Sequence, residues 1–314
     1  MDSNMGTVKA GSARVGDGEP AFGRGMASGL IAVVMWGLAP VATRAVVADV
    51  APLHLAALRT LIAGVALLPW CVPVLRRLDR ATVVRLVAAG LLGMVGYNLP
   101  VALGIQWLPA STAALILATE PIWILGLGRV FLAESVSARA WGGSAVALTG
   151  IAVLAGPNAL HAESGGRTLE GFGLVMLGTA LFGAYTIVLR PLSLTLGPLA
   201  ATAASTAAGA VPYLALTWMI PAHQLAALPR AAWGELAFLA LGSTVAGMLL
   251  WNLAVARSGS SRAGLLLFLE PLVGVIGGIT LLGERLSPGS AVGGVLITLG
   301  VTIAWTAQRR AGTG

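Results

Sequence analysis

Long apolar stretches separated by short polar segments dominate this chain. Ten stretches are mostly apolar, and each ends at a charged residue, a proline or a turn-forming residue. A helix of about 20 apolar residues crosses the hydrocarbon core of a bilayer and satisfies its backbone hydrogen bonds internally. We therefore predict an all-α integral membrane protein with ten transmembrane helices. The predicted spans are residues 27–47, 53–72, 84–106, 109–131, 139–156, 171–190, 196–220, 234–256, 259–283 and 290–307.

Two segments outside the spans are polar. Residues 1–26 are rich in Gly, Ala and Ser, and they lack the apolar core that a signal peptide carries ahead of its cleavage site. We interpret them as a disordered cytoplasmic tail, because so polar a segment buries too little apolar surface to offset the entropy of ordering. Residues 157–170 are the most polar internal segment, and we predict that they link two five-span halves, residues 27–156 and 171–310.

The two halves resemble each other in sequence. With an offset of 150 positions, residues 109–156 match residues 259–306 at 12 of 48 positions, and a second block matches with an offset of 146. The informative pairs are Glu120-Pro121 with Glu270-Pro271, Glu134 with Glu284, Trp36-Gly37 with Phe182-Gly183, and Arg44 with Arg190. Because each half has five spans, an odd number, the second half enters the membrane in the opposite sense. We therefore predict two inverted repeats, which are typical of secondary transporters.

The composition excludes an ordinary soluble protein. The chain is 57% hydrophobic and 10% charged, whereas soluble domains average about 45–50% and 25%. Its net charge of +7 comes from short basic clusters between spans, which argues against a nucleic-acid partner. Of the 19 Lys and Arg residues, 14 fall on the side of the N-terminus and four on the other side, with Arg59 inside a span. Since positive loops stay in the cytoplasm, both termini are predicted to be cytoplasmic in an inner-membrane protein.

Metal, redox and catalytic chemistry have little support. The single cysteine, Cys71, cannot close an intramolecular disulfide, and His54, His161 and His223 are too scattered for a metal site. No intramembrane nucleophile and base, and no metal-binding motif, are present in the sequence. We therefore predict a protein that is not an enzyme and that uses no cofactor.

Three ionisable residues lie near the middle of predicted spans: Arg59, Glu120 and Glu270. Each costs about 2.5–3.5 kcal/mol at the centre of a membrane helix, so we expect all three to face the bundle interior and to have a function. Proton coupling at Glu120 or Glu270 requires that Arg59 does not neutralise both carboxylates. The alternative is structural, because the proline after each glutamate removes a backbone hydrogen bond and kinks the helix.

Aromatic and amide side chains at similar depth are candidates for the wall of a substrate cavity. Asn98 is the stronger member of the Tyr97-Asn98 pair, because an amide has no reason to face lipid, whereas Trp and Tyr are often interfacial anchors. The candidate substrate-binding residues are Trp36, Tyr97, Asn98, Trp123, Trp251 and Asn252. The candidate hinge residues are Gly37, Pro40, Gly183, Pro121 and Pro271.

Closely spaced glycines bear on helix packing. Gly274 and Gly278 form a Gly-x-x-x-Gly pattern, and Gly289 and Gly293 form another. Such patterns let helices approach closely. We favour packing within the chain over a dimer interface, and the sequence leaves open whether the protein is a monomer or a homodimer.

The five-plus-five arrangement, the Trp36-Gly37 pair, the two Glu-Pro pairs and the loop residues Glu134 and Gly283-Glu284 resemble the drug/metabolite transporter superfamily, EamA type. The Tyr97-Asn98 pair and the mid-depth aromatic residues look most similar to YddG-type amino-acid exporters. The resemblance implies a cavity lined by the first to fourth and sixth to ninth spans, with the fifth and tenth peripheral.

The substrate class follows from the charges at mid-depth. A phosphorylated substrate needs several basic residues in the cavity, and only Arg59 is available. A zwitterion needs groups of both signs, which favours export of neutral or aromatic amino acids by alternating access. The alternative is efflux of drugs or lipophilic cations, which would use the carboxylates and the aromatic residues.

Overall fold

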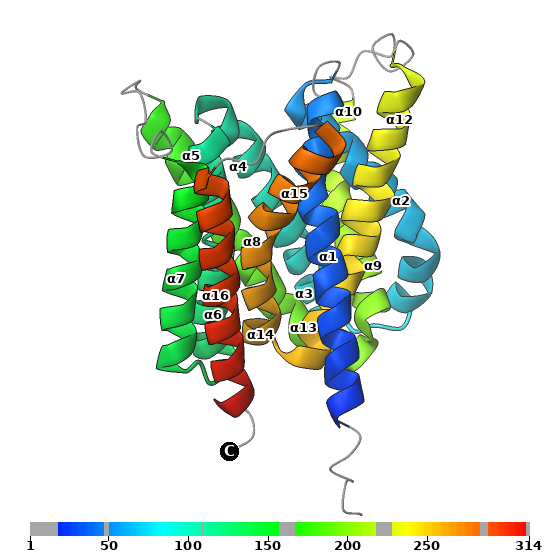
Figure 1. Cartoon of the computed structure of the whole chain (residues 1–314). Coiled ribbons are helices and arrows are strands. Elements are labelled where there is room, and N and C mark those ends of the chain that lie inside the picture. The colour runs from blue at the N-terminus through cyan, green and yellow to red at the C-terminus, as the bar shows by residue number, and fades with distance from the viewer. Residues whose placement is uncertain are drawn as a thin grey trace, which may run out of the picture.

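The computed structural model describes residues 18–46, 50–108, 110–156, 167–217, 228–282 and 288–311, which form a helical bundle without strands (Figure 1). In these ranges, nine helices are long and apolar enough to cross a membrane. They are Pro52–Leu75, Arg80–Trp107, Thr112–Phe131, Ala138–Ala155, Thr168–Leu196, Pro198–Thr217, Arg230–Ser258, Ser260–Leu281 and Pro288–Gln308. The first predicted span corresponds to a helix whose apolar part, Gly25–Pro40, is shorter. The all-helical membrane architecture is thus confirmed, with nine full spans where ten were predicted.

Several spans consist of more than one helical segment. In the first half the segments are α1 (Gly18–Val46), α2 (Pro52–Leu75), α3 (Arg80–Gly90), η1 (Leu91–Gly96), α4 (Tyr97–Gly104), η2 (Ile105–Trp107), α5 (Ala110–Leu117), α6 (Glu120–Phe131) and α7 (Ala138–Ala155). In the second half they are α8 (Thr168–Leu196), α9 (Pro198–Ala210), η4 (Val211–Tyr213), α10 (Leu214–Thr217), α12 (Arg230–Ala237), η5 (Phe238–Ala246), α13 (Gly247–Ser258), α14 (Ser260–Gly264), η6 (Leu265–Leu269), α15 (Glu270–Leu282) and α16 (Pro288–Ala311).

Local sequence explains where many helices begin and end. Asp79 accepts hydrogen bonds from the backbone of Ala81 and Thr82, which caps the start of α3. Proline occupies the first position of α2 and α9, where its missing N–H has no helical partner to lose. Gly197, with φ of 86°, ends α8 in the left-handed conformation that glycine adopts without steric cost.

Four spans depart from regular α-helix at mid-depth. The third and eighth spans contain π-helices, η1 and η5. The fourth span breaks between α5 and α6, and the ninth passes from the 3-10 helix η6 into α15. α6 and α15 begin at Glu120 and Glu270, so both predicted Glu-Pro positions mark a change of helix geometry.

Helices from the two halves pack against each other throughout the bundle. The pairs in contact include α1 with α13 and α15, α8 with α4 and α6, α2 with α9, and α7 with α16. The last pair is close because its surface is glycine-rich: a Cβ added to Gly143 would lie 2.6 Å from the carbonyl oxygen of Gly300. Gly293 likewise packs against Gly150, so this predicted small-residue surface is used inside the chain.

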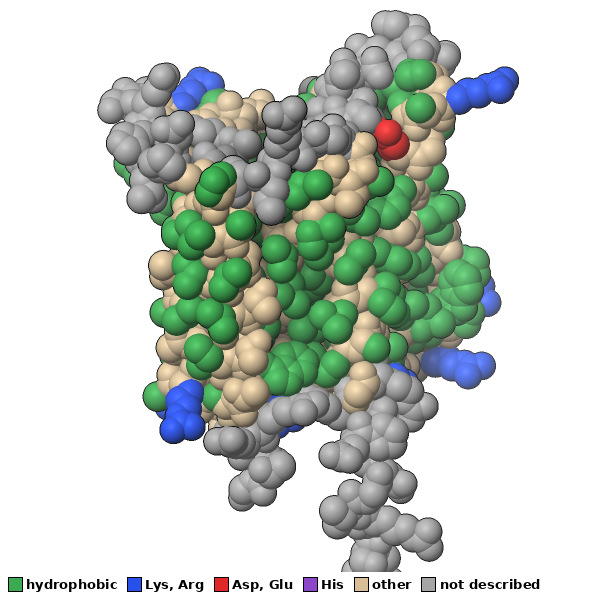
Figure 2. Space-filling model, in the orientation of Figure 1, with side chains coloured by type: hydrophobic (Ala, Val, Ile, Leu, Met, Phe, Trp, Pro, Cys, Tyr) green, Lys and Arg blue, Asp and Glu red, His purple; other side chains and the backbone are tan. Residues whose placement is uncertain are grey.

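The outer surface matches the environment of a bilayer. Apolar side chains cover the middle of the molecule, and Lys and Arg lie toward its two ends (Figure 2). Large apolar side chains such as Val130 and Phe131 are 72% and 70% exposed, which is expected where lipid is the solvent. The start of α1 and the end of α16 lie at the same end of the bundle (Figure 1). We call this end the N-terminal end.

Candidate substrate cavity

A cavity of about 340 Å³ lies at mid-depth between the two halves. Its lining comes from the first, second, third, fourth, sixth, eighth and ninth spans. The lining residues are Trp36, Ala39, Pro40, Thr43, Pro52, Leu55, Ala56, Arg59, Gly93, Met94, Tyr97, Asn98, Val101, Ala102, Ile105, Leu117, Glu120, Phe182, Ser243, Thr244, Met248 and Glu270. α1 contributes its second half and α2 its first half, so the cavity extends from mid-depth away from the N-terminal end.

The three intramembrane charges predicted from the sequence meet at this cavity. Arg59, Glu120 and Glu270 all line it. The Arg59 Nε donates a hydrogen bond of 3.2 Å to the Thr244 hydroxyl. Among the described residues, Arg59 forms no ion pair with either carboxylate, which meets the condition that Arg59 does not neutralise both. Glu120, Glu270 and Tyr97 line the same cavity. Both carboxylates therefore line the cavity without a direct contact to the guanidinium among the described residues.

The π-helix η5 supplies a backbone acceptor at the cavity wall. A π-helix pairs residues five apart, which displaces carbonyl groups from the regular α-helical ladder. The Trp36 Nε1 donates a hydrogen bond of 2.9 Å to the carbonyl oxygen of Ser243, and the Thr244 hydroxyl donates one of 2.8 Å to the carbonyl of Leu239. Because Arg59 also binds Thr244, the eighth span holds both the indole and the guanidinium in place.

The π-helix η1 has a similar role in the third span. The carbonyl oxygen of Met94 accepts two side-chain hydrogen bonds, one of 2.8 Å from Asn98 and one of 2.7 Å from the hydroxyl of Tyr213. One N–H of the Asn98 amide is thus held by its own helix, which leaves the amide oxygen and the second N–H to a ligand. Neither π-helix is predicted by the apolar pattern.

An aromatic cluster borders the cavity. Phe182 lies at its centre, with ring centroids 5.2 Å from Tyr97, 5.8 Å from Trp36 and 5.8 Å from Tyr185. Such separations are those of favourable ring pairs. Phe182 was not among the predicted site residues, although it aligns with Trp36 at the offset of 146 positions. That alignment is the signal that could have identified it.

Three of the six predicted substrate-binding residues lie outside the cavity lining. Trp251 is fully buried and donates a hydrogen bond to Thr186. Asn252 is 2% exposed and donates hydrogen bonds of 2.7 and 2.9 Å to the hydroxyls of Tyr185 and Thr202, so its amide serves the protein core. Trp123 is 36% exposed at the outer surface.

The predicted hinge glycines lie at close helix crossings. A Cβ at Gly37 would lie 2.6 Å from the Val273 side chain, at the crossing of α1 and α15. A Cβ at Gly183 would lie 2.9 Å from Trp123, at the crossing of α8 and α6. α1 passes through Pro40 without interruption, whereas Pro121 and Pro271 follow the changes of geometry in the fourth and ninth spans.

Comparisons with known proteins agree with this architecture. The EamA-like transporter family matches twice, over residues 23–156 and 169–306. A probable terminal-alkyne amino-acid exporter of Streptantibioticus cattleyicolor is 31% identical over 87% of this chain and 91% of its own. A probable amino-acid metabolite efflux pump of Salmonella typhimurium is 26% identical over 87% and 92%. The uncharacterized inner membrane transporter YedA of Escherichia coli is 28% identical over 81% of each chain.

The fold also has a counterpart among solved structures. One crystal structure superposes with a TM-score of 0.77 at 20% sequence identity, covering 93% of this chain and 98% of its own. At this identity the similarity concerns the fold alone.

Proposed function

Because the chain belongs to the EamA-like transporter family, we propose that it is a secondary transporter that exports small metabolites, above all neutral and aromatic amino acids, by alternating access. Family and relatives are transporters, which supports a function in transport rather than catalysis. The protein is a multi-pass membrane protein, and we propose that both termini face the cytoplasm, in accord with the distribution of Lys and Arg.

The proposed mechanism depends on two inverted repeats. Helix contacts between the halves have counterparts in which the two halves swap roles. The first span, α1, contacts α13 and α15 of the eighth and ninth spans, and the sixth span, α8, contacts α4 and α6 of the third and fourth spans. Two close glycine contacts follow the same rule, since Gly37 meets Val273 and Gly183 meets Trp123, at offsets of 146 and 150 positions. These correspondences support a pseudo-two-fold relation, in which interchanging the two conformations moves the opening from one side to the other.

The observation that supports a zwitterionic substrate is a cavity lined by side chains of both charge signs. Arg59, with its hydrogen bond to Thr244, is suited to a substrate carboxylate, while Glu120, Glu270 and the Trp36 ring are suited to an ammonium group. Phe182 and Tyr97 offer aromatic faces to a side chain. The volume of about 340 Å³ lies at the lower end of the range of about 300–1,000 Å³ for ligand pockets, which suits a small metabolite.

Efflux of lipophilic cations is the second candidate. The observation in its favour is the bond between Arg59 and Thr244, because an arginine with a protein partner can have a purely structural role. The carboxylates and aromatic rings would then hold the cation. The two functions differ in what Arg59 contacts during transport.

Purified protein in proteoliposomes separates the candidates. We expect saturable uptake of labelled phenylalanine and leucine, and we expect unlabelled amino acids to inhibit it by competition. Uptake is measured with and without an imposed pH gradient. Glu120→Gln and Glu270→Gln are compared with Glu170→Gln, an exposed carboxylate outside the cavity. Loss of gradient dependence in one of the first two variants, with Glu170→Gln unchanged, would assign proton coupling. Accumulation of a lipophilic cation without amino-acid uptake would establish the second candidate instead.

A further inference from the structure

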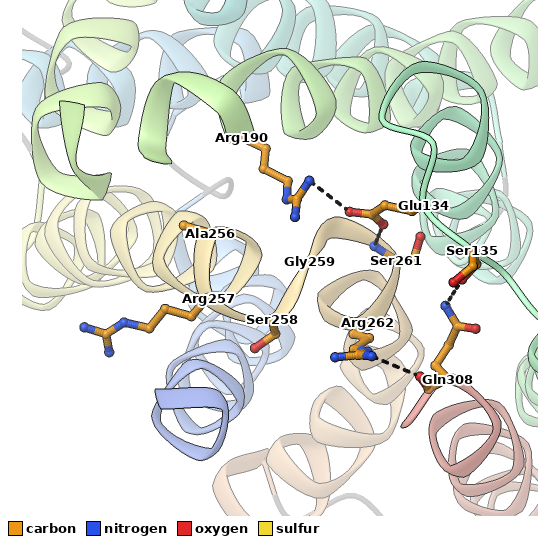
Figure 3. Close-up of a pocket in the computed structure, with 10 residues that line it drawn as sticks. All are labelled: Glu134, Ser135, Arg190, Ala256, Arg257, Ser258, Gly259, Ser261, Arg262 and Gln308. Carbon is orange, nitrogen blue, oxygen red and sulfur yellow. Dashed lines mark hydrogen bonds and ion pairs between the residues drawn. The ribbon is translucent and has the colours of Figure 1, made fainter. Parts of the chain in front are cut away.

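A polar cluster joins the two halves at the N-terminal end of the bundle, away from the cavity. It consists of Glu134 in the loop between α6 and α7, Arg190 in α8, and Ser260 and Ser261 at the start of α14; we call it the Glu134 cluster. The contact of the neighbouring Ser258 with Gly25 shows that the cluster lies at this end, because Gly25 is near the start of α1. Figure 3 shows the Glu134 carboxylate between Arg190 and the chain at Ser261.

Both carboxylate oxygens of Glu134 are bonded to the second half of the chain. Oε1 accepts hydrogen bonds from the backbone nitrogen of Ser260, at 2.9 Å, and from its hydroxyl, at 2.7 Å. Oε2 accepts one of 2.7 Å from the backbone nitrogen of Ser261, and Arg190 Nη1 lies 3.3 Å from Oε1. Bonds between charged acceptors and backbone N–H groups are among the stronger hydrogen bonds in proteins.

The backbone around the carboxylate is built for this contact. Among the described residues Ala133 is the only non-glycine with a positive φ, at 51°, and it immediately precedes Glu134. Gly259, with φ of 88°, immediately precedes Ser260. A Cβ at Gly128 would lie 3.1 to 3.2 Å from Ser260, Ser261 and Glu134, so this glycine leaves room for the cluster. A left-handed alanine costs of order 1 kcal/mol and persists where surrounding contacts compensate for it.

The cluster borders a polar hollow of about 360 Å³, which Arg190, Arg257 and Ser258 also line (Figure 3). Among the described residues, Arg190 Nε and Ser258 Oγ are buried and have no hydrogen-bond partner. Separation of the Glu134 cluster would therefore expose its charges to a space already lined by polar groups, which lowers the cost of breaking these bonds compared with an apolar interior.

The contact connects directly to the cavity through one span. Ser260 and Ser261 begin the ninth span, which continues through η6 to Glu270 at the cavity wall. Glu134 belongs to the first half, and it therefore ties the start of the ninth span to the opposite half while the cavity extends toward the other end. For the cavity to reach the N-terminal end, these helix ends must separate.

We propose that the Glu134 cluster is a gate contact, in which the Glu134 carboxylate holds the N-terminal end closed by binding the start of the ninth span and must release it once in each transport cycle. The inference rests on the alternating access proposed above. It gives Glu134 and Ser260 a role in transport. The sequence match between the two halves does not by itself suggest this role.

Cysteine accessibility tests the gate without requiring transport. Ala102, which lines the cavity, is changed to Cys in a Cys71→Ala background and reacted with a membrane-impermeant maleimide in vesicles of each orientation. With Glu134 intact, we expect labelling mainly from the side opposite the N-terminal end. Glu134→Gln should raise labelling from the N-terminal side about tenfold, since about 1.4 kcal/mol of lost stabilisation is a factor of ten in the equilibrium.

Matched variants separate the gate from general damage. Ser260→Ala, which removes only the hydroxyl bond, should raise the labelling by a smaller factor, and Arg139→Gln, an exposed charge at the start of α7, should leave it unchanged. Unchanged labelling in both Glu134→Gln and Ser260→Ala would overturn the proposal. If amino-acid uptake fails but labelling still shifts, the proposed substrate is wrong and the gate stands. If uptake occurs but labelling does not shift, the substrate stands and the gate is wrong.

Discussion

The Trp36 indole nitrogen and the Ser243 carbonyl oxygen are 2.9 Å apart although 207 positions separate them in the chain. This bond joins the first and eighth spans at the cavity, and its acceptor is a carbonyl of the π-helix η5. The space for the indole depends on Gly247, because a Cβ there would lie 2.7 Å from Nε1. A backbone irregularity and a glycine thus fix the orientation of one aromatic ring at the cavity wall.

Trp36→Phe tests this bond. The variant keeps an aromatic face but leaves the Ser243 carbonyl without its donor, which costs about 1–3 kcal/mol for a buried group. We expect a lower unfolding temperature together with a higher KM for amino-acid uptake. Trp70→Phe is the control, because Trp70 is 50% exposed at the outer surface. Equal effects of the two changes would contradict a specific role for Trp36.

Arg59→Gln separates the two candidate functions. If Arg59 binds a substrate carboxylate, the variant should raise KM for phenylalanine by tenfold or more, in line with the loss of about 1.5–3 kcal/mol from a charge-assisted hydrogen bond. Uptake of a lipophilic cation, measured in parallel, should not weaken. Thr244→Val removes the protein partner of Arg59 but keeps its charge, and we expect it to have the smaller effect on KM. A larger increase of KM in Thr244→Val than in Arg59→Gln would indicate that Arg59 has a structural role.

The two asparagines should differ in function. Asn252 binds two buried hydroxyls, so Asn252→Ala leaves Tyr185 and Thr202 without their donor and should destabilise the protein by about 1–3 kcal/mol. In the part of the chain that the structure describes, Asn98 donates only to Met94 in its own span, and it lines the cavity, so Asn98→Ala should raise KM with a smaller loss of stability. Thermal unfolding in detergent and uptake kinetics measure the two effects. An unchanged unfolding temperature for Asn252→Ala would refute its assignment to the core.

Neighbouring glycines in α7 allow a matched test of helix packing. A Cβ at Gly143 would lie 2.5 Å from the Ala304 backbone nitrogen, whereas one at Gly142 meets nothing within 4 Å. We expect Gly143→Ala to destabilise the protein by about 1–3 kcal/mol through overpacking against α16. Gly142→Ala should be neutral or stabilise by up to about 1 kcal/mol, since alanine favours the helix. Similar unfolding temperatures for the two variants would contradict the packing.

The Glu134 cluster should keep its strength across the physiological pH range. Burial raises the pKa of the Glu134 carboxyl, but hydrogen bonds from Ser261 and Ser260 outweigh it, so the pKa lies below its ordinary value. A carboxylate with a lowered pKa stabilises the closed end above the ordinary pKa and loses this effect as the pH falls through the lowered value. Maleimide reacts with the thiolate, so the labelling rate itself rises with pH. The ratio of Ala102→Cys labelling from the N-terminal side to labelling from the opposite side should therefore be constant between about pH 6 and 8. A rise of this ratio near pH 7 would mean that another group controls the gate.

The sequence alone determined the membrane class, the family, the position of most spans and the three intramembrane charges. These features are local: an apolar stretch long enough to cross a bilayer shows itself by its length, and a charged residue inside such a stretch is rare enough to stand out. The correspondence of the two halves is also a property of the sequence alone, because it rests on matching rare residue types such as Glu120-Pro121 and Glu270-Pro271.

Only the tertiary structure decided which side chains face the cavity. Each residue turns an α-helix by about 100°, and a π-helix alters that rotation, so the face that a residue presents after η5 cannot be read from regular spacing. Trp251 and Asn252 consequently lie in the core, while Ser243, Thr244 and Met248 line the cavity. The role of Glu134 was hidden for a similar reason, because its partners Ser260 and Ser261 follow it by more than 120 positions and meet it only when the two halves pack together.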